Sequence, residues 1–206
     1  MKKFFLREFF GHFDIALMFL LFFLGIGLTL PHWHRGDIWI ALGIGMICYA
    51  ISEYLIHRFF FHMKPPQNKF LLKLLKRLHY DHHYDPNDLK LLFLPVWYSL
   101  PLIATAMFIY YLILQNLDLT IAFGTGIIAY LLAYEWMHYV AHRPIRPLTP
   151  WGRWMKKIHL WHHFKNEHYW YGVTNPIFDI ALGTYKDEKE TTRSKTVRNL
   201  EKRESN

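Results

Sequence analysis

The sequence predicts an all-α membrane protein in which four transmembrane helices carry a helical cytosolic cap. Three observations predict this fold. Hydrophobic residues make up 52% of the 206 residues and charged residues only 19%, which is typical of a membrane protein with a polar cap. Four long apolar stretches are separated by segments of very different length. Nearly all the lysines and arginines fall on one side of the arrangement that these stretches predict.

The four apolar stretches are long enough to cross the hydrocarbon core of a bilayer as helices. We predict spans at about 13–30, 38–56, 96–114 and 119–140. The connections at 31–37 and 115–118 are too short to fold, so the first two spans and the last two form antiparallel pairs. The longer segments at 57–95 and after 141 remain to form the cap. We assign 1–185 to one membrane domain and the charged stretch 186–206 to a flexible cytoplasmic tail.

The distribution of basic residues predicts the orientation of the spans. Of the 24 lysines and arginines, all but Arg35 in the first short loop lie on one side. The positive-inside rule makes that side cytoplasmic, together with both termini and the cap. A net charge of +8 then faces anionic lipid headgroups, and no nucleic-acid partner is expected. The chain is therefore predicted to be an integral multi-pass protein. A bacterial cytoplasmic membrane is favoured, and the endoplasmic reticulum is the alternative.

Histidine is abundant, at 14 residues, and ten of these lie in four groups at or beyond the cytoplasmic ends of the spans. The groups are His57 and His62; His79, His82 and His83; His138 and His142; and His159, His162 and His163. Residues three and four apart share one face of an α-helix, so each H-x-x-H-H group can aim three imidazoles at one point. His57 and His62 lie about 140° apart on an ideal helix. They must serve two metals or lie where the helix breaks.

Ten clustered imidazoles predict a metal centre. A thiolate site is excluded because Cys48 is the single cysteine. Two ions with about five nitrogens each would use all ten rings, and imidazole suits iron, copper, zinc or nickel. A structural zinc site usually closes with four ligands, so the ligand number favours a redox pair that activates dioxygen. Glu53 and Glu135 are expected to accept imidazole N–H groups and fix the rings, with direct ligation as the alternative. Asp81 is a weaker candidate for the same role, with a solvated side chain as the alternative.

The stretches that carry these histidines resemble the fatty acid hydroxylase superfamily (sterol desaturase/fatty acid hydroxylase), and its fatty acid 2-hydroxylase branch most. The matching stretches are HRFFFHMKPP (57–66), HYDHHYDPNDLKLLFLP (79–95), YEWMHYVAH (134–142) and HLWHHFKNEHYWYGVTNPIFD (159–179). The resemblance extends over roughly residues 50–185. It implies a four-helix membrane domain, a cytosolic cap and a centre of two iron ions held by the ten histidines. Zinc can replace the iron in purified protein.

The resemblance also implies an activity, which is O₂- and electron-dependent hydroxylation of a fatty acid or sphingolipid acyl chain at the carbon next to its carbonyl. Eukaryotic relatives often carry a fused cytochrome b5 domain, for which this chain has no room. Electrons are therefore expected from a separate donor of the ferredoxin or cytochrome b5 type. One alternative is a sterol or carotenoid hydroxylase or desaturase with the same centre. Another is a histidine-rich metal transporter, which should place more ionisable residues inside its spans than this sequence does.

Overall fold

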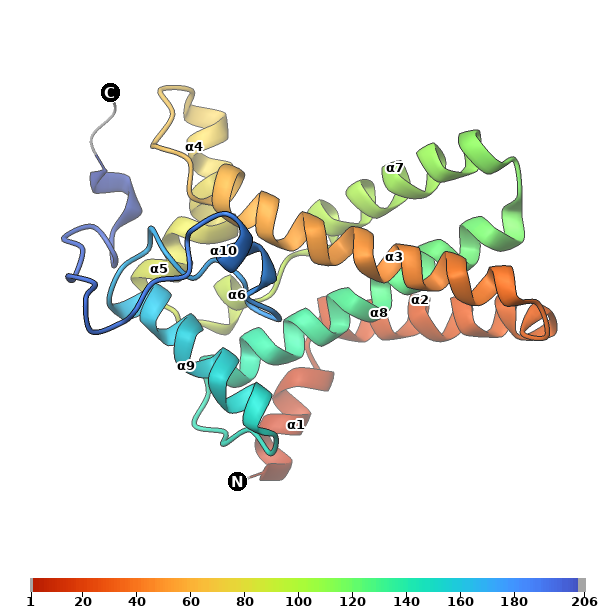
Figure 1. Ribbon diagram of the computed structural model, residues 1–206, viewed down its shortest axis with the longest axis horizontal. Coiled ribbons are helices and arrows are strands. Elements are labelled where there is room, and N and C mark those ends of the chain that lie inside the picture. Colours follow the sequence, from red (N-terminus) through yellow and green to blue (C-terminus); the bar gives the residue numbers. More distant parts are fainter. Residues whose placement is uncertain (1, 204–206) are drawn as a thin grey trace. The chain divides into compact units, whose positions relative to one another are not determined.

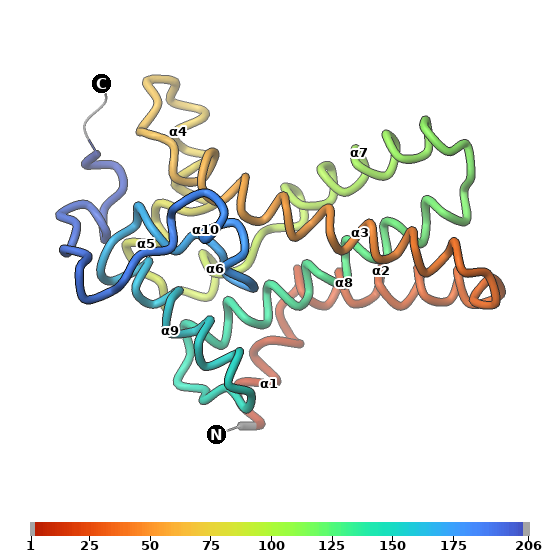
Figure 2. The backbone as a smooth tube through the Cα atoms, viewed as in Figure 1, coloured from red at the N-terminus to blue at the C-terminus, as the bar shows by residue number. Residues whose placement is uncertain are grey.

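The computed structural model describes residues 2–203 of the chain, and the regular elements within this range are all helices. The chain divides into two compact units. Unit 1 comprises Met1–Ala50 and Leu94–Glu135, and unit 2 comprises Ile51–Phe93 and Trp136–Asn206. The helices are labelled in Figure 1, and the course of the backbone can be followed in Figure 2. Residues 204–206, the end of the predicted tail, lie outside the described range.

Four helices are long and apolar enough to cross a membrane, and they begin and end within a few residues of the predicted spans. They are α2 (Phe13–Thr29), α3 (Gly36–Leu55), α7 (Val96–Leu114) and α8 (Leu117–Ala141). Local sequence explains the limits of α7. Pro95 precedes it with an extended backbone, and Gln115 ends it in the left-handed conformation at φ 49°.

The remaining helices are shorter. They are α1 (Lys2–Phe10), η1 (Leu30–His32), η2 (Ile56–Phe61), α4 (Lys69–Leu75), η3 (Lys76–Tyr80), α5 (Asp81–Tyr84), α6 (Leu89–Leu92), α9 (Pro150–Phe164), α10 (Ile177–Ala181) and η4 (Leu200–Lys202). Two of them are π-helical: η2 continues α3, and η3 joins α4 to α5. The start of α9 follows ordinary capping rules, because the Thr149 hydroxyl accepts from the Gly152 N–H and Pro150 occupies the first turn.

Close helix packing holds unit 1 together. The backbones of α3 and α8 approach at two glycines: a Cβ at Gly45 would collide with the Phe123 carbonyl, and one at Gly126 with that of Leu42. Small residues allow such contacts between membrane helices, where lipid supplies little hydrophobic driving force. The carboxylate of Asp14 at the start of α2 accepts the Val96 N–H at the start of α7 over 2.8 Å.

Unit 2 contains two small apolar clusters. One is formed by Met155, Ile158 and Trp170, and the other by Leu75, Tyr80 and Leu200. Leu200 belongs to the predicted tail, so the expectation of a solvated segment does not hold at this position. Two apolar side chains in a charged stretch, Val197 and Leu200, are too few for a periodic pattern, yet both are buried. The domain limit at residue 185 stays a prediction.

Candidate metal centre

The ten predicted histidines lie in two groups of five, both within unit 2. The first histidine group is His57, His62, His79, His83 and His162. The second histidine group is His82, His138, His142, His159 and His163. Within each group, one ring nitrogen per residue lies within 4.8 Å of all the others. None of the ten residues is more than 7% exposed.

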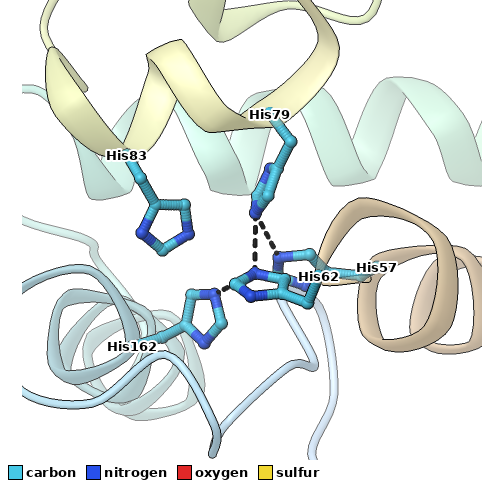
Figure 3. A group of neighbouring side chains, drawn as sticks. All are labelled: His57, His62, His79, His83 and His162. Atoms are coloured by element: carbon cyan, nitrogen blue, oxygen red, sulfur yellow. Dashed lines mark hydrogen bonds between the residues drawn. The ribbon is translucent and has the colours of Figure 1, made fainter. Parts of the chain in front are cut away.

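Figure 3 shows the first histidine group, whose rings converge from three segments of the chain. The Nε2 atom of His79 lies 3.2 Å from that of His57 and 2.7 Å from that of His62. The Nε2 atoms of His62 and His162 are 2.9 Å apart. Metal–nitrogen bonds of about 2.1 Å place neighbouring ligands at right angles about 3 Å apart. The spacing of these nitrogens therefore fits ligands around one ion.

The second histidine group has the same spacing. The Nε2 atoms of His82 and His138 are 3.0 Å apart, and those of His142 and His159 are 2.9 Å apart. His163 completes this group, and its ring stacks on that of His83 in the first group with 4.1 Å between the centroids. The two groups are therefore direct neighbours, as a centre with two ions requires.

The structure corrects the expectation that each H-x-x-H-H group aims three rings at one point. In α9, His159 and His163 enter the second group, whereas His162 enters the first. Successive helical residues turn by about 100°, so residues four apart differ by only about 40°. His162 and His163 differ by the full 100°, and they point into different groups. His79, His82 and His83 divide in the same way, with His82 in the second group.

His57 and His62 belong to the same group, so the option of two separate metals is wrong for this pair. The sequence also left open a break in the helix, and the structure has a wider turn that ends there. The His62 N–H donates to the His57 carbonyl over 3.1 Å, which is the five-residue hydrogen bond of a π-helix. The wider turn of η2 brings residues five apart to one side.

Backbone carbonyls set the tautomers of three rings in the first histidine group. His57 Nδ1 lies 2.5 Å from the Tyr171 carbonyl and His162 Nδ1 lies 2.7 Å from the Tyr169 carbonyl. His83 Nδ1 makes the same contact with the Val197 carbonyl, at 2.9 Å. A carbonyl only accepts, so each Nδ1 carries the proton and each Nε2 presents a lone pair to the group. Lone pairs that converge in this way fit a cation between them.

Burial keeps these imidazoles neutral. It lowers the pKa of His79, His83 and His163 well below the usual value, and repulsion from neighbouring imidazoles lowers it further. Neutral imidazole is the form that binds metal. His83 Nε2 and both ring nitrogens of His163 are buried without a hydrogen-bond partner within residues 2–203. Such atoms are costly to bury unless a ligand satisfies them, so the residues fit a metal centre.

Glu53 acts on the site in a different way from the one expected. Instead of an imidazole N–H, its Oε1 accepts the backbone N–H groups of Val173 at 2.7 Å and Thr174 at 2.9 Å. Its Oε2 accepts the Thr174 hydroxyl at 2.5 Å. The loop that Glu53 holds contains Tyr171, whose carbonyl accepts from His57. Glu53 therefore supports His57 through the backbone.

The other two carboxylates also have partners that were not expected. Glu135 Oε1 accepts the Leu94 N–H at 3.0 Å, and both residues belong to unit 1. Asp81 lies 3.9 Å from the Lys76 ammonium, and its side chain is 44% exposed. Neither contact is the imidazole hydrogen bond that the sequence suggested. A charge pair with this exposure contributes little to stability.

Replacing Glu53 with glutamine should loosen the loop that it holds. An amide nitrogen cannot accept a hydrogen bond, so the Thr174 hydroxyl must turn to accept from it. Hydrogen bonds to a carboxylate, about 1.5–3 kcal/mol each, are replaced by neutral ones of about 0.5–1.5 kcal/mol. We expect a lower unfolding temperature and a lower metal-to-protein ratio in Glu53→Gln. The exposed Glu190, replaced in the same way, is the matched control. Wild-type values for both quantities in Glu53→Gln would contradict the assigned role.

Several residues that shape the site could not be found from the sequence. Tyr169 and Tyr171 act through their carbonyls, which every residue type has. Asp179 Oδ1 and Oδ2 accept the N–H groups of Tyr171 and Gly172 at 2.8 and 2.7 Å, across a turn that no periodic pattern marks. His168, which was left out of the ligand set, lies outside both groups, and its side chain is 53% exposed.

Comparison with known proteins places these features in a family context. The sequence model of the fatty acid hydroxylase family matches residues 41–184, which include all ten histidines. Fatty acid 2-hydroxylase of Rattus norvegicus is 35% identical over 150 residues, which cover 71% of this chain and 39% of the relative. The ceramide very long chain fatty acid hydroxylase SCS7 of Saccharomyces cerevisiae is 35% identical over 147 residues, which cover 69% of this chain and 37% of the relative.

A solved structure of full-length scs7p, in which only the hydroxylase domain is visible, has the same fold. It aligns with a TM-score of 0.75 and 26% identity, over 90% of this chain and 74% of that chain. This match and the four apolar helices confirm the predicted fold class and a multi-pass membrane protein. The chain spans about two fifths of the length of the two curated relatives described above.

Proposed function

This chain belongs to the fatty acid hydroxylase family, and from that premise we propose that it hydroxylates a lipid acyl chain at the carbon next to the carbonyl. The single observation that carries the proposal is the pair of histidine groups, five buried imidazoles each, inside the segment that matches the family. The relatives named as fatty acid 2-hydroxylase and as a ceramide fatty acid hydroxylase support an acyl substrate, free or in a sphingolipid. Neither name points to a sterol, a carotenoid or metal transport.

We assign one iron ion to each histidine group, with the ten histidines as ligands. Two bound iron ions would supply the activation of O₂ that an unreactive C–H bond requires, with electrons from a separate donor of the ferredoxin or cytochrome b5 type. The chain contributes the ligands and their orientation. The carbonyls of Tyr169 and Tyr171 fix two rings, and burial of the histidines excludes bulk water from the ligand atoms. Imidazole also binds zinc, so zinc can occupy the sites in purified protein.

The proposal includes a location for the reaction. Both termini and the histidine groups are assigned to the cytoplasmic side, because the basic residues predict that orientation. An acyl chain would then reach the centre from the surrounding bilayer, and a soluble donor would reach it from the cytoplasm. A bacterial cytoplasmic membrane is favoured over the endoplasmic reticulum.

The test is lipid analysis of a host that makes no 2-hydroxy fatty acids and expresses this chain. Mass spectrometry should detect 2-hydroxy acyl lipids with the wild-type protein and none with His83→Ala, at equal levels in the membrane. His168→Ala is the matched control, because this exposed histidine lies outside both groups, and it should retain the product. Hydroxylation at another carbon, a new double bond, or an unchanged product in His83→Ala would contradict the proposal.

A further inference from the structure

Residues 194–203, which we call the C-terminal segment, lie beyond the match to the family at 41–184 and contact two ligands of the first histidine group. We infer that the C-terminal segment is a working part of the metal centre, and that it positions His62 and His83 for the ion in the first group. The inference rests on the proposed metal centre. It assigns a role to a stretch whose composition predicts only a solvated tail.

The C-terminal segment forms hydrogen bonds with both the ring and the backbone of His83. The Val197 carbonyl accepts from the His83 ring at Nδ1 over 2.9 Å. The neighbouring Arg198 donates from Nε to the His83 carbonyl over 2.8 Å, and from a terminal nitrogen to the Tyr84 carbonyl over 2.5 Å. The ring and the backbone of this ligand are therefore tied to two successive residues. Hydrogen bonds behind a metal-binding histidine fix its tautomer and the orientation of its ring.

Arg203 holds His62 in a similar way. One terminal nitrogen of the guanidinium donates to the His62 carbonyl over 2.7 Å, and the other lies 2.7 Å from His62 Nδ1. A guanidinium only donates, so His62 accepts at Nδ1, unlike His57 and His83, and the neutral ring carries its proton on Nε2. An ion that binds Nε2 would displace this proton. The planar fork of Arg203 sets the ring relative to its own backbone. The opposite edge of the ring carries Nε2, which faces His79 and His162.

The position of Arg203 is itself defined by a buried partner. Its side chain is only 8% exposed, and its Nε lies 3.5 Å from Oε1 of Glu167, whose side chain is fully buried. The Thr196 hydroxyl donates to the same oxygen over 2.5 Å. Burying a guanidinium without a counter-charge costs several kcal/mol, and Glu167 offsets this cost at the position that Arg203 occupies.

Apolar packing anchors the C-terminal segment against the chain that carries the ligands. Leu200 is fully buried against Leu75, the last residue of α4, and Tyr80, the last residue of η3, which leads to His82 and His83. Glu201 adds an ion pair with Lys76 at 2.8 Å. The course of this segment past α4 and α5 can be followed in Figure 2. The contacts with His62 and His83 thus belong to a packed segment.

The experiment compares metal retention in the purified full-length protein. Wild type, Arg203→Ala, Arg203→Lys and Arg198→Ala are loaded with Co²⁺, and its release to a chelator is followed by visible absorption. Lys202→Ala is the matched control, because it removes an exposed positive charge next to Arg203. In Arg203→Ala, one of the two cobalt ions should be held about 10- to 100-fold more weakly, the usual effect of losing a group behind a metal ligand. The other ion should be held as in wild type.

Arg203→Lys should recover only part of the loss, because one ammonium cannot reproduce the two-pronged contact with His62. Arg198→Ala should weaken the same ion through His83, and it keeps the test decisive if Arg203→Ala does not fold. Equal weakening of both ions, or a lower unfolding temperature with wild-type cobalt retention and spectrum, would overturn the inference and reduce the segment to packing. A wild-type protein that binds no cobalt would instead refute the proposed metal centre.

Discussion

Replacing His162 with alanine should weaken the binding of one metal ion, and replacing the adjacent His163 should weaken the binding of the other. The two residues are neighbours on α9, yet His162 belongs to the first histidine group and His163 to the second. Four imidazoles remain in each damaged group, so we expect weaker binding of that ion, by more than the 10- to 100-fold typical of groups behind the ligands. Hydroxylation should be lost in both variants, because the proposed chemistry needs both ions.

The measurement is the metal-to-protein ratio during titration with a chelator, combined with the product assay. Each variant should release one ion early and the second at the wild-type chelator concentration. The protein should remain in the membrane, because neither residue belongs to a predicted span. His168→Ala should behave as wild type. Early release of both ions from both variants would show that the ligands do not divide as the structure indicates, and full activity in both would contradict their role as ligands.

Removing both ions should destabilise unit 2 selectively. All ten histidines lie there, and His57, His83 and His162 present converging lone pairs at Nε2. Each ion that binds only the folded state adds about 4 kcal/mol at a free concentration 1,000 times its dissociation constant. We expect metal-free protein to exchange backbone hydrogens faster in α5 and α9, whereas α7 in unit 1 keeps its protection. Unchanged exchange in α5 and α9 would argue against ion-dependent packing.

Adding metal back to the metal-free protein distinguishes the structural role of the ions from their role in the reaction. Ferrous iron should restore both the protection of α9 and the hydroxylation of an acyl chain. Zinc should restore the protection without the activity, since it has no redox chemistry. A zinc-loaded enzyme that hydroxylates lipids at the rate of the iron-loaded enzyme would contradict the proposed chemistry.

The parts of this protein that the sequence predicts well are those with a local signal. The limits of α7 follow from apolar length and from Pro95, and the observed helix begins and ends where it was predicted. The ten histidines were found because their spacing repeats and because they gather beside the spans. Both signals are read from residues that are close in sequence, where helix geometry makes the consequences calculable.

The parts that could not be predicted depend on long-range contacts or on an irregular helix. Glu53 accepts from Val173 and Thr174, about 120 residues away, and no local pattern encodes that contact. The π-helical turn before His62 adds one residue to a turn that ordinary periodicity treats as α-helical, so the grouping of His57 and His62 could not be derived. Arg203 is one of many basic residues in a charged stretch, and only the fold distinguishes it from its exposed neighbour Lys202.

The division of neighbouring histidines between two groups has a mechanical consequence. His162 and His163 are joined by one peptide bond, and so are His82 and His83, so α5 and α9 each contribute rings to both histidine groups. Backbone hydrogen bonds keep the pitch of a helical turn constant, so a change in the separation of the two groups would require a change of histidine rotamers or unwinding of α5 or α9. Rotation of either helix about its axis would therefore disturb both histidine groups at once, together with any ions that they hold.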